Sequence, residues 1–266
     1  MTRPSSAVLR PPIAFTDAHL ATTPHSIFLH QPLSTILNLD ALLSSPHPFA
    51  TISTLWQTLH SAKAISHPNR FLSATIPTST YATMHALARQ HPQFVLPLPR
   101  EGGGTEFFFL QWAFYEHDQA TVIFTSLEEY KLKQGYARPF LTLTHWTDLA
   151  EEVPTCAVGE GEVGGGAVLM RGEITSTTPP KMAVKGKDGE EVSPPLDQKE
   201  RYLIGMADAQ LLLLGLQRFY NLEGSGEAGD REQRRTVLEG FTKGDWQEKE
   251  WEGLKGLAVG SLSGLV

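Results

Sequence analysis

Apolar residues recur at two different spacings along this chain, and the spacing separates the expected helices from the expected strands. Phe49, Ile52, Trp56 and Leu59 fall three or four positions apart, which is typical of one face of an amphipathic helix. The strand-like stretches are shorter and are bounded by proline, glycine or polar residues. The pattern predicts helices over 48–62, 79–90 and 202–220, one after Ser126, and a short one around 148–152. It predicts strands over 71–77, 94–98, 106–115, 121–125, 140–144 and 167–175.

Local signals refine three of these elements. Ser126 followed by Glu129 has the form of a capping box, in which the serine caps a helix start and the glutamate reaches back. Pro97 cannot donate a ladder hydrogen bond, so the strand over 94–98 is expected at a sheet edge or to end there. The strands over 106–115 and 121–125 are close enough in sequence to form a hairpin.

The order of the elements predicts one α+β domain over residues 31–266. Helices and strands do not alternate regularly, which argues against a doubly wound parallel sheet. Residues 1–30 are proline-rich and read as a flexible N-terminal arm. The glycine-rich 153–166 and the polar 176–199 lack an apolar period, so we expect two flexible insertions there. The tail beyond residue 231 is amphipathic only in parts and is interrupted by glycines.

The strand over 106–115 is apolar on both faces. Side chains alternate along a strand, so Phe108, Leu110, Trp112 and Phe114 share one face, while Phe107 and Phe109 lie on the other. The helices over 48–62 and 202–220 are expected to cover one face. Two readings of the second face stay open: it is covered as well, so that the strand is sandwiched in the core, or it is partly kept for the exposed apolar surface of another protein.

Composition and charge exclude several classes of partner and site. The chain has 266 residues and a net charge of −7, and an acidic protein is a poor ligand for nucleic acid. No apolar run reaches the roughly 20 residues that a membrane span needs. The single cysteine, Cys156, rules out a disulfide framework and a multi-thiolate metal site.

Candidate motifs for chemistry lack the context that they need. Residues 159–164 match G-x-G-x-x-G, but a strand rather than a helix follows, so no helix N-terminus is available for a pyrophosphate. Eight of the ten histidines lie in the first 100 residues, several of them beside prolines, and none has metal-ligand spacing. Arg171 and Glu173 alternate with apolar residues on a strand, where they can contact a partner or form a solvated cross-strand ion pair.

An ordered set of segments resembles the mitochondrial F1-ATPase assembly factor 1 family. The resemblance covers roughly residues 33–220, and the 153–166 and 176–199 stretches depart from the family pattern. The segments are LWQTLH (55–60), SATIPTSTYATMHALARQHPQF (73–94), FVLPLPREGGGTEFFFLQWAF (94–114), VIFTSLEEYKLKQGYARPFLTLTHWTDL (122–149), VLMRGE (168–173) and ADAQLLLLGLQRFY (207–220).

The resemblance implies a fold, a function and a compartment. It implies a largely antiparallel sheet flanked by helices, and a chaperone of the mitochondrial matrix that binds the unassembled F1 β subunit and shields its α-facing surface. It implies no enzymatic activity and no cofactor, and we expect a monomer. The alternative is an enzyme that binds a small ligand in an unrecognised pocket. Our hypothesis for the partner-binding residues is the sheet around Phe108, Trp112 and Phe124, with Arg171 and Glu173 at its polar margin.

Overall fold

The structure is a computed structural model of the 266-residue chain. It describes residues 31–44, 47–100, 102–116, 119–150, 166–177, 184–185, 191–192, 201–222, 228–246 and 248–259. The expected arm over 1–30 and Cys156 lie outside the described residues, as does nearly all of the 153–166 insertion. Of the 176–199 insertion, the described part includes a small antiparallel pair, β7 (Val184–Lys185) and β8 (Glu191–Val192).

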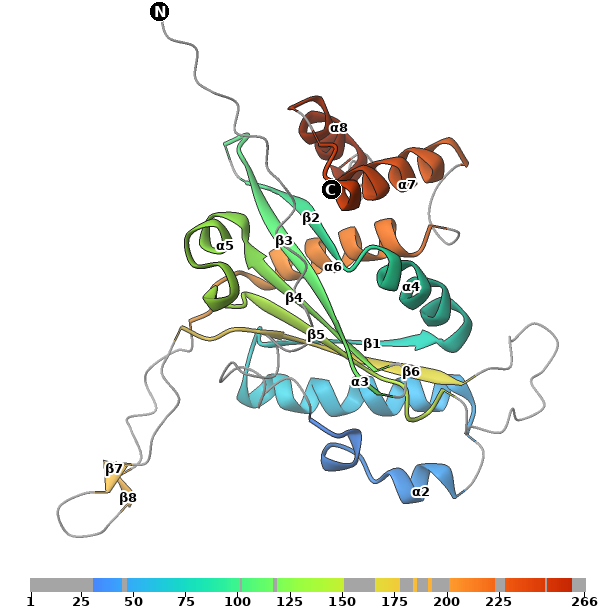
Figure 1. The fold of residues 1–266 in the computed structure, drawn as a ribbon. Coiled ribbons are helices and arrows are strands. Elements are labelled where there is room, and N and C mark those ends of the chain that lie inside the picture. Colours follow the sequence, from blue (N-terminus) through green and yellow to red (C-terminus); the bar gives the residue numbers. More distant parts are fainter. Residues whose placement is uncertain are drawn as a thin grey trace, which may run out of the picture.

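A six-stranded sheet forms the centre of the fold (Figure 1). Its order is β1-β6-β5-β4-β3-β2, and each neighbouring pair is antiparallel, which confirms the predicted α+β class with a largely antiparallel sheet. The strands are β1 (Phe71–Pro77), β2 (Gln93–Pro99), β3 (Thr105–Phe114), β4 (Ala120–Ser126), β5 (Leu141–Trp146) and β6 (Ala167–Ile174). Strand β2 is an edge strand, as Pro97 predicted. Proline has no backbone N–H to donate, and an edge strand has a hydrogen-bonded neighbour on one side only, so the loss is tolerated there.

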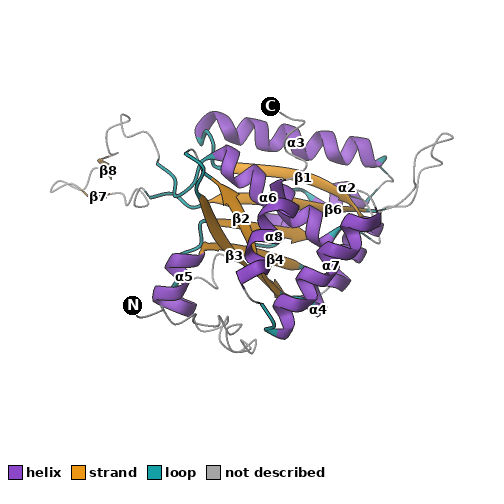
Figure 2. Ribbon diagram, turned by 90° about the horizontal axis from the view of Figure 1, so that it is seen from above, coloured by secondary structure: helices purple, strands orange, loops and turns teal. Residues whose placement is uncertain are grey.

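Helices cover the two faces of the sheet unequally (Figure 2). One face, here called the helix-packed face, lies under α4 (Thr78–Gln90), α6 (Met206–Tyr220), α7 (Ala228–Lys243) and α8 (Glu248–Val259). The opposite face carries the 3₁₀ helix η2 (Leu33–Thr35), α2 (Leu39–Leu43) and α3 (Phe49–Ser66) beside β1, β5 and β6. It also carries α5 (Leu127–Lys133) and the 3₁₀ helix η4 (Gln134–Tyr136), because Tyr130 of α5 stacks on Phe109 of β3 at 4.3 Å.

This arrangement corrects one expectation about coverage. The helices predicted over 48–62 and 202–220 were expected on the same face of the sheet, but α3 and α6 lie on opposite faces. The Trp56 indole of α3 donates a hydrogen bond to the Met170 carbonyl of β6 at 2.9 Å, on the opposite face. Phe219 of α6 instead contacts Phe94 of β2, with ring centroids 4.8 Å apart, on the helix-packed face.

Three helix details also differ from the sequence pattern. Ser126 precedes α5, but its side chain makes no capping hydrogen bond, so the predicted capping box is wrong. Helix α6 begins at Met206 rather than near Tyr202, because Tyr202 forms a β-bridge with Ser176. Residues 148–150, expected to start a short helix, form a turn closed by a hydrogen bond from the Ala150 N–H to the Thr147 carbonyl.

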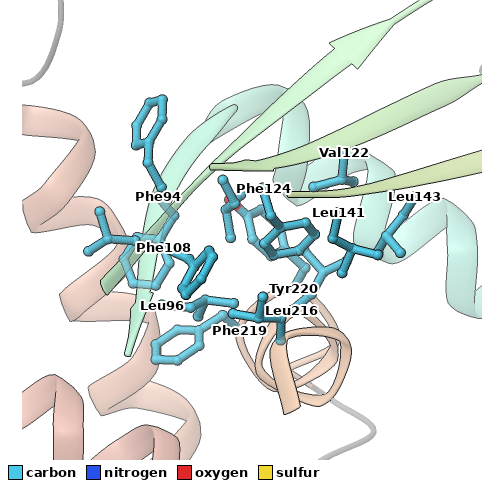
Figure 3. Close-up of a cluster of buried hydrophobic side chains, with 14 of the residues drawn as sticks. Phe94, Leu96, Phe108, Val122, Phe124, Leu141, Leu143, Leu216, Phe219 and Tyr220 are labelled. Atoms are coloured by element: carbon cyan, nitrogen blue, oxygen red, sulfur yellow. The ribbon is translucent and has the colours of Figure 1, made fainter. Parts of the chain in front are cut away.

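The main core lies between the sheet and α6. Figure 3 shows Phe108, Phe124 and Leu141 of three strands gathered with Leu216 and Phe219 of α6, and all five are fully buried. The strands also approach one another closely here. A Cβ on Gly172 would lie 2.9 Å from a methyl of Leu143, so this position of β6 accepts only glycine without a shift of its neighbours.

The burial of Phe124 makes a stability prediction. Phe124→Ala should lower the free energy of unfolding by about 3–5 kcal/mol, because it removes a buried ring and leaves a cavity. Leu132→Ala, at a side chain that is 81% exposed, is the control and should stay within about 0.5 kcal/mol of the parent. Urea denaturation measures both, and an equal effect of the two substitutions would contradict the assignment of Phe124 to the core.

The burial of His145 makes a pH prediction. Its side chain stacks on Trp112 at 5.7 Å, and burial lowers its pKa from 6.5 to about 4, with a smaller contribution from His85. This histidine therefore becomes protonated below about pH 6.5 in the unfolded chain, but only below about pH 4 in the folded chain. Because the unfolded state binds more protons between these two values, the stability of the fold decreases across this window as the pH drops. The loss from this residue should approach, at most, about 3 kcal/mol.

His145→Gln should flatten this part of the pH dependence of unfolding. Burial also lowers the pKa of His60 and His91, so a smaller slope in the same direction should remain. Urea titrations of the parent and the variant between about pH 7 and pH 4.5 test this expectation. An unchanged slope in the variant would show that another group causes the acid sensitivity.

Candidate protein-interaction site

The three aromatic residues predicted to contact a partner are core residues. Phe108 and Phe124 are fully buried on the helix-packed face, and Trp112 is only 3% exposed. Trp112 stacks on His145, with ring centroids 5.7 Å apart, and also contacts the tilted ring of Tyr220, with ring centroids 5.4 Å apart. The expectation that these side chains form an exposed patch is therefore wrong for this structure, and β3 is sandwiched instead, which was the other reading of its two apolar faces.

The cross-strand register also separates these aromatics from Arg171 and Glu173. Phe124 lies opposite Leu141, and Leu141 lies opposite Ile174, so Ile174 points to the helix-packed face. Glu173 and Arg171, one and three positions earlier on β6, consequently point to the opposite face. The five predicted residues thus occupy two sites on the two sides of the sheet, rather than one patch with a polar margin.

Arg171 and Glu173 belong to a compact group of charges around the ring of Phe71, which we call the Phe71 cluster. It consists of Lys63, Arg70, Phe71, Arg171 and Glu173. The Lys63 Nζ lies 5.8 Å from the ring centroid, the Arg70 Cζ 5.2 Å and the Arg171 Cζ 5.8 Å. Cations at these distances are attracted to the negative face of the ring, by about 0.5–1 kcal/mol each at exposed sites.

The polar contacts of the Phe71 cluster are unequal. The Arg70 guanidinium donates two hydrogen bonds to Glu173 Oε1, at 2.6 Å from Nη2 and 3.2 Å from Nε. Arg171 donates to the neutral side-chain oxygen of Gln31 at 2.8 Å, and its guanidinium lies 5.2 Å from the ring centroid of Trp146. Since Trp146 itself donates to the Gln31 carbonyl at 2.7 Å, Gln31 is held against the sheet by two hydrogen bonds.

Crowding of like charges shows in the acid–base properties of the cluster. Burial lowers the pKa of Lys63, and the nearby Arg171 lowers it further, while Glu173 acts in the other direction. Burial also lowers the pKa of Arg171, where Glu173 again opposes the shift and Arg70 adds to it. The single carboxylate therefore compensates three cations only in part.

Large apolar side chains are exposed to solvent on α3, α5 and η4. The most exposed are Ile65 of α3 at 86%, Tyr136 of η4 at 84% and Leu132 of α5 at 81%. Sequence reasoning missed them, although a signal was present. Leu132 lies between Lys131 and Lys133 on the charged side of a helix whose apolar side holds Tyr130, and an apolar residue in that position has no core to enter.

The α5–η4 segment is held in one shape although its apolar residues are exposed. Gln134 has φ 51° and ψ −127°, a backbone conformation that usually requires glycine. Such strain costs on the order of 1–3 kcal/mol and persists only where surrounding contacts enforce it. Here Glu129 pairs with Lys133 at 2.7 Å and accepts the Arg138 N–H at 3.4 Å, and the Arg138 side chain donates to the Ser176 carbonyl at 2.7 Å.

These features lie toward one end of the sheet, where β6 ends and β1 begins (Figure 1). The Ile174 N–H donates to the Arg70 carbonyl, and the Thr175 N–H donates to the Phe140 carbonyl, so β6 links the start of β1 to the start of β5. Ser176 then joins this end to Arg138 beyond η4. The Phe71 cluster and the exposed side chains of α3, α5 and η4 consequently border a common end of the opposite face.

Groups with strongly shifted pKa values lie elsewhere, in the core. His145 is buried under α4, and burial raises the pKa of Tyr220, whose hydroxyl donates to the His91 carbonyl at 2.8 Å. In the described part of the chain, no three His, Cys, Asp or Glu side chains come together in a group that could hold a metal ion. None of the described helices is long and apolar enough to cross a membrane.

Comparison with known proteins identifies the family. The sequence profile described as ATP11 protein matches residues 17–254. The chain is 34% identical over 197 residues to "Protein atp11, mitochondrial" of Schizosaccharomyces pombe, an alignment that covers 74% of this chain and 53% of the relative. It is 34% identical over 120 residues to "ATP synthase mitochondrial F1 complex assembly factor 1" of Danio rerio, covering 45% of this chain and 35% of the relative. The chain therefore spans about half the length or less of these relatives, and it belongs to the ATP11 protein family.

Proposed function

We propose that this chain is an assembly factor for the F1 sector of ATP synthase, which binds the unassembled β subunit and shields the surface that α subunits later cover. Family membership is the observation that carries the proposal, since one relative is named mitochondrial and the other an F1 complex assembly factor. The β subunit as client and the mitochondrial matrix as compartment follow from the resemblance of the quoted segments to the assembly factor 1 family.

The surface around the end of β6 supports a protein client. A subunit without its neighbours exposes apolar area, and a binder must offer a complementary patch of about 800 Å². Within such patches a few well-held side chains supply most of the affinity. Leu132 and Tyr136 satisfy this requirement, because they are exposed on a segment whose backbone is fixed by Glu129 and Arg138. Arg171 and Glu173 are proposed as polar contacts beside them.

Shielding of this kind needs binding but no chemical step. A chaperone that occupies the assembly surface lowers the concentration of free, aggregation-prone subunit by mass action. The affinity must still allow the α subunit to displace the chaperone. We therefore propose that the chain acts as a monomer, without enzymatic activity and without a cofactor of its own.

Aggregation of the isolated β subunit provides the first test. The purified chain should suppress light scattering from β near one-to-one stoichiometry in the absence of ATP, because one chain is proposed to cover one β subunit. Isolated α subunit under the same conditions is the control and should be protected much less. Equal protection of α and β would contradict specificity for β.

Single substitutions at the exposed side chains provide the second test. Tyr136→Ala and Leu132→Ala should each weaken binding of β by about 2 kcal/mol, close to 30-fold in Kd, if these side chains are anchors. Leu214→Ala on α6 is the matched control, because Leu214 is also an exposed leucine, at 40%, but lies among the helices of the other face. Calorimetric titration should show unchanged affinity for this control. Equal affinities in all three variants would show that β binds to a surface other than α5 and η4.

A further inference from the structure

The Phe71 cluster has fewer carboxylates than its cations require. Three cations, Lys63, Arg70 and Arg171, surround one ring, and Glu173 is bound closely to only one of them, Arg70. Among the described residues, no carboxylate lies within ion-pair distance of Lys63 or Arg171. Arg171 is paired with the amide of Gln31, which carries no charge.

Packing rather than charge balance keeps these cations together. The Arg171 guanidinium lies by the rings of Phe71 and Trp146, and the Arg70 backbone is fixed by the hydrogen bond from Ile174. Like charges that are held close in a partly desolvated site repel one another, and an added carboxylate would lower that energy. The cluster is reachable, since the side chains of Arg70 and Glu173 are 29% and 37% exposed.

We propose that the Phe71 cluster binds an aspartate or glutamate side chain of the partner protein, at the rim of the apolar surface that Leu132 and Tyr136 contact. This inference rests on the proposed function, and it names the chemical group that the polar part of the site recognises. Arg70 and Arg171 supply planar donors suited to a carboxylate, and Lys63 supplies a third positive charge near the same ring.

Two observations favour a protein carboxylate over a polyanion such as nucleic acid. The whole chain has a net charge of −7, which repels an extended polyanion, whereas a single carboxylate responds mainly to its nearest charges. Ile65 projects from α3 two residues beyond Lys63 and is 86% exposed. An exposed isoleucine in the last turn of the helix that carries Lys63 fits a protein partner, whose surface presents apolar groups as well as an acidic one.

Substitutions of opposite sign test this proposal. Binding of the isolated F1 β subunit is measured by calorimetry at low salt. Lys63→Gln and Arg171→Gln should each raise Kd by about tenfold, since each removes a cation that faces the partner carboxylate. Glu173→Gln should instead lower Kd several-fold, because it removes the carboxylate that competes for Arg70. Lys63→Arg, which keeps the charge, should bind like the parent.

A purely structural role of the cluster gives a different result. Loss of the Arg70–Glu173 ion pair would then weaken binding along with the other two changes, in proportion to lost folding stability. Urea denaturation of each variant detects such a loss, and Lys63→Gln is the most informative variant because, among the described residues, the Lys63 ammonium makes no ion pair and lies near the ring of Phe71. If all three neutralising variants bind β like the parent, or all weaken binding together, the proposal is wrong while the proposed function stands.

A second probe covers the case in which the parent chain binds no F1 subunit, a result that would reject the proposed function. An oligoglutamate peptide and inorganic phosphate are then titrated separately, and the His60 and His67 ring signals are followed by NMR, because both rings contact Phe71. Saturable shifts with the peptide that Lys63→Gln abolishes would support a carboxylate site. Tighter binding of phosphate than of the peptide, or no response to either, would overturn the proposal.

Discussion

The alternation of side chains in a sheet with fixed register is the constraint on which the rest of this structure depends. Because β6 pairs with both β1 and β5, its residues 170, 172 and 174 must enter the helix-packed core, and Arg171 and Glu173 must leave it. A slip of one residue would bury two charges and expose Met170 and Ile174. Gly172 suits this register, because a Cβ there would press on the side chains of Leu143 and Leu72. The apolar core and the charged cluster are thus two consequences of one pairing pattern.

Much of the fold could be predicted from the sequence because its signals are local. Strand β1 has the predicted bounds, and the other sheet strands lie within two residues of theirs, since alternation and flanking breakers act over a few positions. Helices α7 and α8 were not predicted as elements, because glycines interrupt their apolar pattern. Packing on β2 outweighs that weak local preference: Phe94 contacts Phe241 of α7 and Trp246 in the connection between the two helices. The faces chosen by α3 and α6 depend on chain topology, which amphipathic spacing does not encode.

The proposed interaction site was less predictable, for a related reason. A strand with two apolar faces, such as β3, is equally consistent with a buried centre and a binding surface, and only the placement of helices decides between them. The Phe71 cluster brings together residues from 63 to 173, which meet through the β1–β6 register. Leu132 did carry a local signal, since it lies on the charged side of a short helix. Hydrophobic periodicity predicts which residues are buried. It does not predict exposed apolar side chains on a segment whose strained backbone is fixed by hydrogen bonds.

Taken with the family assignment, these features support the proposal that the protein acts by binding through a surface. The described acid–base groups with the largest shifts serve the core, while one end of the sheet offers apolar side chains beside uncompensated cations. The central claim is that this surface and the α subunit compete for the same part of β. Sedimentation of a preformed complex of this chain with isolated β, during titration with α, tests it most directly. The account predicts that α releases the chain as α–β contacts form, and a stable ternary complex of all three proteins would contradict it.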